Sequence, residues 1–530
     1  MPTALLVAVL LAGIVVLTPL ADRVRIPAPV LLTVFGLAVP LVPGVPELRL
    51  DPEYILPVVL PPLLFAATQR ASVHDYRRNA SPILLLAVGL TIATAACAAV
   101  VAHALGLPWG PAIVLGAVIA PPDPVAATAV ARRLRLPGRM VAVLEGEGMF
   151  NDATALVMYN LAVAAVVAGG VSAGEIGLEL VLAIVVGIVV GLVAGGLTRL
   201  ALRYLHQAAP ETVVTIAVPF AVYLGAEELG GSGVLAVLAL GLYLRVTSHD
   251  AVTSAGWLLG RSVWDFADFL ITSFVFVFIG FELTAVLRDG SDDRTATIWT
   301  ALALAAVLVV VRFAWVFPVT WLRRLARGAG RPGAEPASTP EATVVSWAGM
   351  RGVVTVASAL ALPHVVDGGG DFPHRSGIVF IALVCVLVTL VLQGLTLAPL
   401  VKALRVGSES DSHAEAATLR REAAVAGLYV VRDATEDDDG KPYPDRVRRA
   451  VELQYEGRID AQDALLEARH GADHDEGDDG DERAVEDLLR RGAEAERDHV
   501  IEARGRGQVS AEAADTVLDD VETRAVREML

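Results

Sequence analysis

Cysteine and charged residues are both scarce in this sequence. Only two cysteines occur among its 530 residues, Cys97 and Cys385, and both lie in apolar stretches. This count excludes a disulfide framework and a metal site built from cysteines. Charged residues make up 19% of the chain and hydrophobic residues 55%. Such a balance argues against a soluble protein of this size.

A surplus of basic residues is also missing. Lysine and arginine number 42, against 59 aspartates and glutamates, and the imbalance lies in residues 401–530, which hold 19 basic and 34 acidic residues. The first 400 residues are nearly neutral and carry no basic stripe that could release counterions from a nucleic acid. We therefore expect no nucleic-acid partner.

Long hydrophobic runs are absent after residue 400 but dense before it. The N-terminus lacks the basic start and the cleavage site of a signal peptide, so we interpret its apolar run as a first membrane span. Runs close to the ~20 residues that cross a bilayer predict an all-α integral membrane protein with about thirteen spans. The predicted spans are residues 3–20, 27–43, 54–68, 82–104, 110–130, 142–167, 174–200, 212–227, 231–245, 263–285, 297–321, 343–362 and 376–400.

The arginines of the first 400 residues support this count and predict an orientation. Seventeen of the 23 lie in alternate connections, four lie in the other connections, and two, Arg312 and Arg351, lie inside spans. By the positive-inside rule, the N-terminus is outside and the C-terminal tail is cytoplasmic. A buried guanidinium stays charged and needs a partner, so Arg312 and Arg351 are candidate site residues.

Span six carries acidic and amide side chains within its apolar run. Residues 141–167 read VAVLEGEGMFNDATALVMYNLAVAAVV and include Glu147, Asn151 and Asp152. An ionised aspartate at the centre of a bilayer costs roughly 3 kcal/mol on insertion scales. Asp152 is therefore a candidate functional residue. The alternative is a structural hydrogen-bonding role at a helix interface.

Two spans contain interruptions of a regular helix. Span five reads AVIAPPDPVAATAV, and its prolines remove backbone donors on both sides of Asp123. Span twelve includes SWAGMRGVVTVAS, with glycines on both sides of Arg351. Paired interrupted helices in inverted halves indicate the binding site of a secondary transporter, although proline and glycine are also common in ordinary membrane helices. The candidate residues of the two breaks are Pro122, Asp123, Pro124, Gly349, Arg351 and Gly352.

Four motifs resemble one known family. EGEGMFNDATALV, APPDPVAATAV, FIGFEL and GMRGVVTVASALALP keep the order and spacing of the bacterial NhaP-type sodium/proton antiporters of the cation:proton antiporter-1 family. The resemblance implies sodium/proton exchange in pH homeostasis by a homodimer in the bacterial plasma membrane. It also implies that residues 1–404 contain a core domain of spans 4–6 and 11–13 and a dimerisation domain of spans 1–3 and 8–10.

The resemblance further implies roles for individual residues. Asp152 matches the ion-binding, proton-carrying aspartate, Asn151 its paired asparagine, and Asp123 the aspartate of the unwound fifth span. Sodium is accordingly expected at Asp152 and Asp123. The family often has threonine where this chain has Pro122, so only a backbone carbonyl can serve as a ligand there.

Three further residues match structural positions of the family. Glu147 and Arg312 match an ion pair that packs span six against span eleven, and Arg351 matches the arginine of the second break. Because its arginine partner should hold Glu147 ionised throughout, we expect Glu147 to exchange no proton.

A buried carboxylate that holds either a cation or a proton couples the two fluxes. Burial penalises the charged form, so Asp152 takes a proton when no cation neutralises it. Sodium is a hard cation that oxygen ligands bind, and carboxylates, carbonyls and the Asn151 amide could supply them. One titrating carboxylate beside a neutral asparagine implies one proton per cation, which predicts electroneutral exchange.

Three other functions are open from the sequence. An antiporter of K⁺ or another monovalent cation would use the same residues, and a passive cation channel would ignore the proton gradient. An intramembrane protease is suggested by GGSGV at residues 230–234. The histidines of the first 400 residues, however, lie in connections or at span ends, whereas a serine nucleophile needs one within hydrogen-bond reach. We expect no enzymatic activity and no cofactor beyond the transported Na⁺ and H⁺.

Residues 405–530 are predicted to form an acidic cytoplasmic region. Apolar residues at helical intervals, as in RAVEDLLRRGAEAERDHVIEARGRG, predict helices. The stretches EDDDGKPYPD and HGADHDEGDDGDE are typical of solvated linkers. A helical domain that modulates transport or stabilises the dimer and a mostly disordered acidic tail both fit this composition.

Overall fold

The structure is a computed structural model that describes residues 3–471 apart from short gaps, and isolated positions beyond residue 471. The gaps are residues 25, 47–50, 124–126, 129, 132–133, 135, 169–172, 249–250, 289–293, 328–337, 368, 407–411 and 437–440. The described positions beyond residue 471 are 492, 495–496, 498–501, 517, 521 and 523. The chain divides into two compact units, Met1–Ser408 and Glu409–Leu530.

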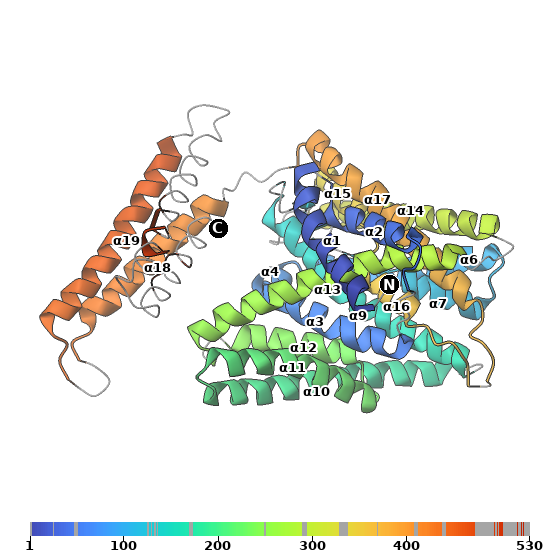
Figure 1. The fold of residues 1–530 in the computed structure, drawn as a ribbon, viewed down its shortest axis with the longest axis horizontal. Coiled ribbons are helices and arrows are strands. Elements are labelled where there is room, and N and C mark those ends of the chain that lie inside the picture. The colour runs from blue at the N-terminus through green and yellow to red at the C-terminus, as the bar shows by residue number, and fades with distance from the viewer. Residues whose placement is uncertain are drawn as a thin grey trace. The chain divides into compact units, whose positions relative to one another are not determined.

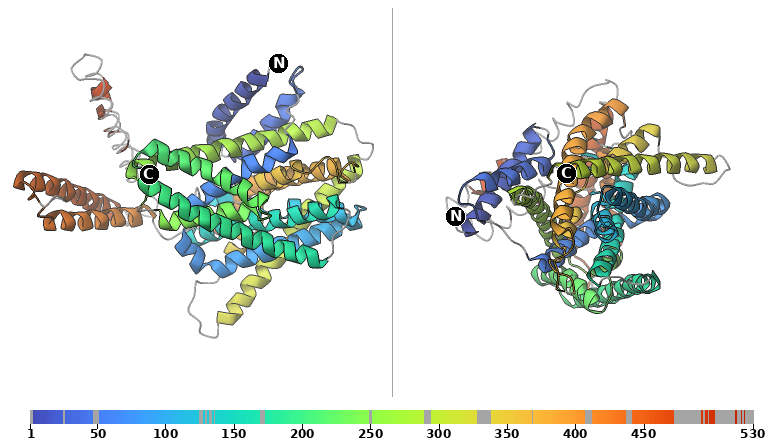
Figure 2. Two further views of the ribbon diagram at one scale, coloured as in Figure 1. Left: turned by 90° about the horizontal axis from the view of Figure 1, so that it is seen from below. Right: turned by 90° about the vertical axis from the view of Figure 1, so that its right-hand side faces the viewer.

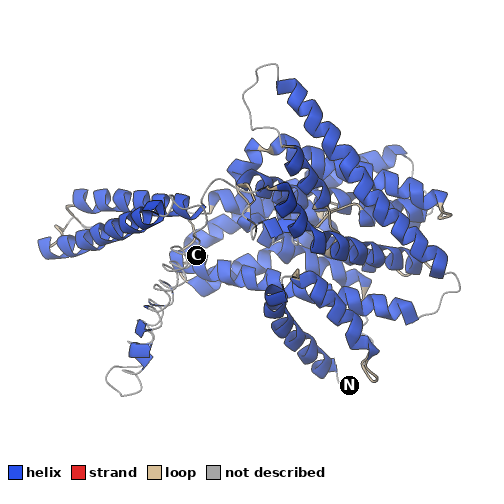
Figure 3. Ribbon diagram, turned by 90° about the horizontal axis from the view of Figure 1, so that it is seen from above, coloured by secondary structure: helices blue, strands red, loops and turns tan. Residues whose placement is uncertain are grey.

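The first unit is helical wherever the structure describes regular elements, as Figure 3 shows. Its helices, most of them labelled in Figure 1, are α1 (Thr3–Val24), α2 (Ala28–Ala38), η1 (Val39–Leu41), α3 (Pro52–Arg70), α4 (Val73–Arg78), α5 (Ala80–Leu84), η2 (Leu85–Leu90), α6 (Thr91–Ala104), α7 (Trp109–Ile119), α9 (Gly138–Val167), α10 (Ala173–Tyr204), α11 (Ala208–Glu228), α12 (Gly233–Thr247), α13 (Ser254–Arg288), α14 (Arg294–Arg327), α15 (Thr339–Trp347), α16 (Val353–Leu360) and α17 (Arg375–Leu404).

Polar caps mark the starts of several of these apolar helices. Ser232 precedes α12 and its hydroxyl accepts a hydrogen bond from the Leu235 N–H at 3.3 Å. Ser338 and Glu341 form a reciprocal capping box at the start of α15, with distances of 3.2 and 2.7 Å. Such caps satisfy backbone donors that the first turn of a helix leaves without partners. The chain therefore signals these helix starts locally.

The predicted all-helical membrane fold is confirmed. Eight of the described helices are long and apolar enough to cross a membrane, and three shorter apolar helices accompany them. Each of the thirteen apolar runs coincides with a described helix or with described helical segments that follow one another in the chain. The exact number of thirteen crossings stays a prediction.

The helices of the first unit pack in two groups. In the first helix group, α2 packs against α13, and α10, α11, α12 and α3 pack side by side (Figures 1 and 2). In the second helix group, α9 packs against η2 and α7, while α14 packs against α6, α15 and α17. The helix α16 contacts α3 and α13 of the first group and α7, α9 and α17 of the second. The short helix α16 thus lies at the junction of the two groups.

In the second unit, the helices α18 (Ser412–Asp433) and α19 (Asp445–Gly471) pack against each other. Arg421 pairs with Asp463, and Arg432 pairs with Glu456 at 2.8 Å. Helices were predicted for this region. The acidic stretch HGADHDEGDDGDE lies almost entirely outside the described residues.

Candidate ion-binding site

The first break follows α7. This helix ends at Ile119, and residues 120–123 are not helical. Pro121 and Pro122 are buried here, and neither has an N–H that could continue the hydrogen-bond ladder of the helix. Pro124 lies outside the described residues.

The second break separates α15 from α16. Residues 348–352 lie between the end of α15 and the start of α16 and are not helical. A Cβ atom at Gly352 would overlap the Asp123 carboxylate, and a Cβ atom at Gly349 would press on the Arg312 side chain. Glycine at both positions therefore allows the second break to approach its neighbours closely.

Backbone and side-chain hydrogen bonds join the two breaks. The Asp123 N–H donates to the Met350 carbonyl at 2.6 Å, and the Asp123 carboxylate accepts from the Val353 N–H at 3.1 Å. Val353 is the first residue of α16, where the helix dipole favours a negative charge. Asp123 from the first break thus caps the half-helix that follows the second break.

Arg351 makes the reciprocal connection. Its guanidinium donates to the carbonyls of Ile119 at 2.9 Å and Ala120 at 3.1 Å, and also to the Gly349 carbonyl. The side chain is only 2% exposed. The last carbonyls of a helix lack intrahelical donors and carry partial negative charge, so Arg351 stabilises the end of α7. Each break therefore supplies the charge that the other broken helix needs.

Asn151 and Asp152 approach these breaks from α9. Asn151 is fully buried, and its Nδ2 donates to the Pro122 carbonyl at 2.9 Å. The Asn151 Oδ1 has no hydrogen-bond partner among the described residues. A buried acceptor without a donor is costly.

A cavity of about 380 Å³ reaches the two aspartates. Asp123 and Asp152 both line it, together with Glu145 from α9, Asp268 from α13 and Arg70 from α3. Arg70 pairs with Asp268 at 2.8 Å. The cavity therefore lies between the two helix groups and brings two intramembrane carboxylates to one space.

Glu147 lies one turn before Asn151 on α9 and faces a different neighbour. It forms a bidentate ion pair with Arg312 of α14, in which Nη2 and Oε2 are 2.8 Å apart. The two side chains are 3% and 2% exposed. Arg312 also donates to the Val345 carbonyl of α15 at 3.0 Å. The pair joins three helices behind the cavity and does not line it.

Two residues of the site were not among the site residues predicted from the sequence. The hydroxyl of Thr389 on α17 accepts from the Arg351 N–H at 3.1 Å, and Asp268 lines the cavity. A lone threonine within an apolar span does not indicate in the sequence that the residue belongs to a site. Asp268 lies near the start of the predicted tenth span, and the sequence left open both an interfacial location and a role in transport. No group of three or more His, Cys, Asp or Glu side chains suited to a resident metal ion occurs in the part of the chain that the structure describes.

Comparison with known proteins identifies the family. The sequence model of the family described as "Sodium/hydrogen exchanger, transmembrane" matches residues 6–403. A protein of Mycobacterium tuberculosis named as an uncharacterized Na(+)/H(+) exchanger is 33% identical over 470 residues, covering 88% of this chain and 84% of that protein. A "Sodium, potassium, lithium and rubidium/H(+) antiporter" of Bacillus pumilus is 29% identical over 385 residues, covering 70% of this chain and 57% of that protein.

The fold is also similar to a solved structure. The sodium proton antiporter MjNhaP1 from Methanocaldococcus jannaschii matches with a TM-score of 0.59 and 19% identity, covering 76% of this chain and 99% of that chain. The family match spans the helices that carry both breaks and α9. The family indicated by the four sequence motifs is confirmed, and this chain belongs to the family of transmembrane sodium/hydrogen exchangers.

Proposed function

We propose that this chain exchanges Na⁺ for H⁺ across the membrane, with Asp152 holding either ion in turn. The observation that carries the proposal is the shared cavity: Asp152 and Asp123 line one space of about 380 Å³ beside two interrupted helices. Carboxylates inside a membrane are costly and mark ion or proton pathways.

Competition between the ions at one carboxylate provides the coupling. In a cavity with restricted access to water, the charged form of Asp152 is penalised, so it holds a proton or a cation but not both. Only the occupied site loses its net charge and moves readily between the two facing states. Exchange of one ion for the other follows, without a leak of either.

The neighbouring groups supply ligands of the chemistry that sodium prefers. Na⁺ is a hard cation and is bound by oxygen atoms. Asp152 and Asp123 provide carboxylates, and the Asn151 Oδ1, which lacks a partner among the described residues, provides an amide oxygen. Because the Asn151 Nδ2 already donates to Pro122, the orientation of that oxygen is set before a cation enters.

One titrating carboxylate favours electroneutral exchange. Glu147 is the other buried acid of α9, but Arg312 pairs with it through two hydrogen bonds. A charge held by such a pair gains no proton during the cycle, because protonation would leave the guanidinium uncompensated. We therefore infer one proton per sodium ion.

The two helix groups suggest how the site changes sides. We infer that a core domain of spans 4–6 and 11–13 moves against a dimerisation domain of spans 1–3 and 8–10, within residues 1–404. The cavity lies between α3 and α13 on one side and α9 and α16 on the other, which is where such a motion would open or close access. We further propose a homodimer in the bacterial plasma membrane, with the N-terminus outside and residues 405–530 cytoplasmic.

Potassium is the second candidate cation. A relative from Bacillus pumilus is named for sodium, potassium, lithium and rubidium. All of these ions take oxygen ligands, and Asp152 could hold any of them by the same competition. In either case the exchange requires no cofactor.

The test is transport by the full-length protein in proteoliposomes. A preset ΔpH, followed with a pH-sensitive dye, should collapse on addition of Na⁺, and the rate should not change when a membrane potential is clamped. The Asp152→Asn variant keeps the shape but loses the titrating group, so exchange should fall to background. Running K⁺ and Li⁺ beside Na⁺ measures the selectivity.

The control is Asp22→Asn, because Asp22 is an exposed residue of α1 outside the cavity. This variant should exchange as the wild type does. If Asp152→Asn retained full exchange, the role of Asp152 would be refuted. A Na⁺ flux that ignores the proton gradient would indicate a passive channel instead.

A further inference from the structure

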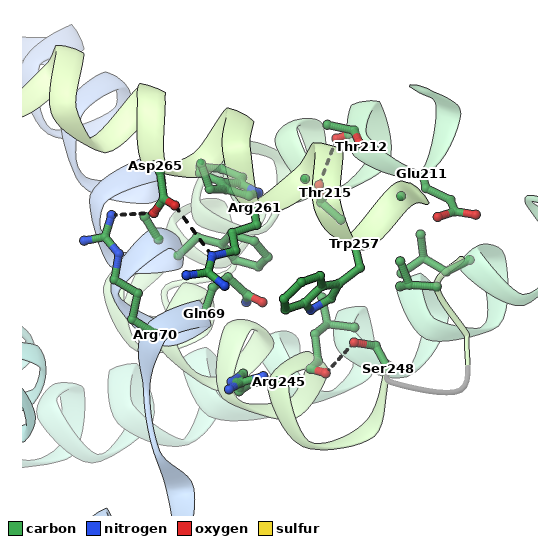
Figure 4. Close-up of a pocket in the computed structure, with 18 residues that line it drawn as sticks. Gln69, Arg70, Glu211, Thr212, Thr215, Arg245, Ser248, Trp257, Arg261 and Asp265 are labelled. Carbon is green, nitrogen blue, oxygen red and sulfur yellow. Dashed lines mark hydrogen bonds and ion pairs between the residues drawn. The ribbon is translucent and has the colours of Figure 1, made fainter. Parts of the chain in front are cut away.

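A second cavity, of about 530 Å³, lies within the first helix group. Side chains of α3, α10, α11, α12 and α13 line it, and Figure 4 shows most of the polar ones. It shares Arg70 with the ion cavity but includes neither Asp152 nor Asp123. Its chemistry is therefore separate from that of the proposed transport site.

One arginine in this cavity forms no ion pair with a described carboxylate. Arg245 donates from Nε to the Ala71 carbonyl at 3.3 Å, and no described carboxylate lies within ion-pair distance of its guanidinium. The other two arginines of the cavity have acidic neighbours: Arg70 lies 3.0 Å from Asp265, and Arg261 lies 3.8 Å from the same residue.

One acid in the cavity likewise forms no ion pair with a described residue. Glu211 is 1% exposed, and its Oε2 accepts from the N–H and hydroxyl of Thr253 at 3.1 and 3.0 Å. Its Oε1 has no hydrogen-bond partner among the residues that the structure describes. No ion pair joins Glu211 to Arg245 or to another described cation.

A third polar group completes the set. Trp264 lines the cavity and is 5% exposed, yet its Nε1–H has no acceptor within the described part of the chain. Trp257 separates Glu211 from Arg245 in the view of Figure 4. The cavity thus offers an acceptor with negative charge on one side, and a cation and a buried N–H donor elsewhere on its lining.

The cavity suits a ligand that carries both a positive and a negative charge. Glu211 is a buried carboxylate without a cation beside it among the described residues, which is destabilising, whereas Arg245 is half-buried. A buried donor or acceptor without a hydrogen-bond partner also costs stability. A purely anionic ligand would satisfy Arg245 and Trp264 but would be repelled by Glu211. A ligand with an ammonium group and a phosphate satisfies all three, since ammonium N–H groups donate to carboxylates and guanidinium groups donate to phosphate.

The position of the cavity favours a lipid headgroup. Arg70 is the last residue of α3, Arg245 lies in the last turn of α12, and Trp257 lies in the first turn of α13. The ends of membrane helices lie at the level of the lipid headgroups, where tryptophan and arginine are enriched. Trp257 is 47% exposed, and Arg261 lies over its ring at 5.6 Å, so the cavity has an interfacial rim.

We propose that this cavity binds a phosphoethanolamine headgroup, with the ammonium at Glu211 and the phosphate at Arg245 and Trp264. The headgroup belongs either to a membrane lipid or to a free phosphoethanolamine molecule. The proposal uses no residue that is proposed to carry ions, and it stands whether or not Asp152 exchanges sodium for protons.

The experiment measures the unfolding temperature of the purified full-length protein in detergent during titration with lipids of identical acyl chains. Phosphatidylethanolamine should raise this temperature in a saturable manner. Phosphatidylcholine has the same charges but no ammonium N–H, and phosphatidylglycerol has no cation, so each should need about tenfold more lipid for the same effect. Free phosphoethanolamine and inorganic phosphate form two further arms.

The variants Glu211→Gln and Arg245→Gln should each raise the half-saturating concentration of phosphatidylethanolamine about tenfold. Arg245→Lys keeps the charge and serves as the second variant if Arg245→Gln does not fold. The matched controls are Glu179→Gln and Arg23→Gln, which change exposed side chains outside the cavity and should leave the titration unchanged.

Each outcome decides the proposal. A preference for phosphatidylethanolamine that both cavity variants weaken supports it. A matching effect of free phosphoethanolamine identifies a soluble ligand of the same chemistry, and no effect of it identifies the lipid. An equal response to all three lipids, full stabilisation by inorganic phosphate alone, or cavity variants that titrate like the wild type would overturn it.

Discussion

The buried pair of Glu147 and Arg312 allows a quantitative test of what holds the second helix group together. Their side chains are 3% and 2% exposed, so water cannot compensate a charge that loses its partner. Removing one member of a buried ion pair costs about 3–5 kcal/mol, whereas replacing both charges together is often nearly neutral. We therefore expect Glu147→Gln and Arg312→Gln to lower stability by about 3–5 kcal/mol each, and the double variant to lose less than about 2 kcal/mol.

The assay is thermal unfolding of the four proteins in one detergent, which completes a double-mutant cycle. The order of apparent unfolding temperatures should be the wild type, the double variant close below it, and then the two single variants. The matched control is the pair of Arg432 and Glu456, whose side chains are 50% and 30% exposed. The same cycle there should show a coupling below about 1 kcal/mol, because water screens an exposed pair.

Additive effects would contradict this reasoning. If the losses of the two single variants added to that of the double variant within about 0.5 kcal/mol, the residues would act independently. A Glu147→Gln protein with wild-type stability but no exchange would place Glu147 in the transport reaction and refute its structural role.

Two further predictions concern the breaks. Gly352→Ala should weaken the apparent affinity for the transported cation about tenfold, because the added Cβ displaces the Asp123 carboxylate. The displacement breaks a charge-assisted hydrogen bond of about 1.5–3 kcal/mol. A wild-type KM for this variant in proteoliposomes would contradict the prediction. Arg351→Gln should lower the unfolding temperature far more than Arg23→Gln, an exposed control, because buried carbonyls at the end of α7 lose their donors. Arg351→Lys should have an intermediate unfolding temperature, since a lysine retains the charge but not the planar fork of donors. Equal unfolding temperatures for these variants would argue against the capping of α7 by Arg351.

Much of the candidate site could be predicted from local sequence. Asp152 is recognisable because an acid interrupts an apolar run, and the break after α7 is recognisable because its prolines lack N–H groups. The second break was predicted from the glycines around Arg351, and its pairing with the first break from the inverted order of the spans.

Contacts between distant segments could not be predicted in this way. The Asn151 amide directed at the Pro122 carbonyl, and the Arg351 guanidinium at the end of α7, join groups that no local pattern relates. The second cavity could not be predicted from the sequence either. Glu211 lies in the first turn of a helix and Arg245 in the last turn of another, and such charges are ordinary at helix ends.

The sequence by itself determined the membrane fold, the two breaks and the presence of Asp152 within an apolar span. Hydrophobicity, proline geometry and the cost of charge in lipid act on each segment locally, so one sequence suffices to read them. Only the tertiary structure decided which charge meets which helix end, that Asp123 and Asp152 share a cavity, and that Glu211 and Arg245 form no ion pair with another described residue. Those relations depend on how the helices pack, because electrostatic and hydrogen-bond energies are set by distances between side chains that lie far apart in the chain.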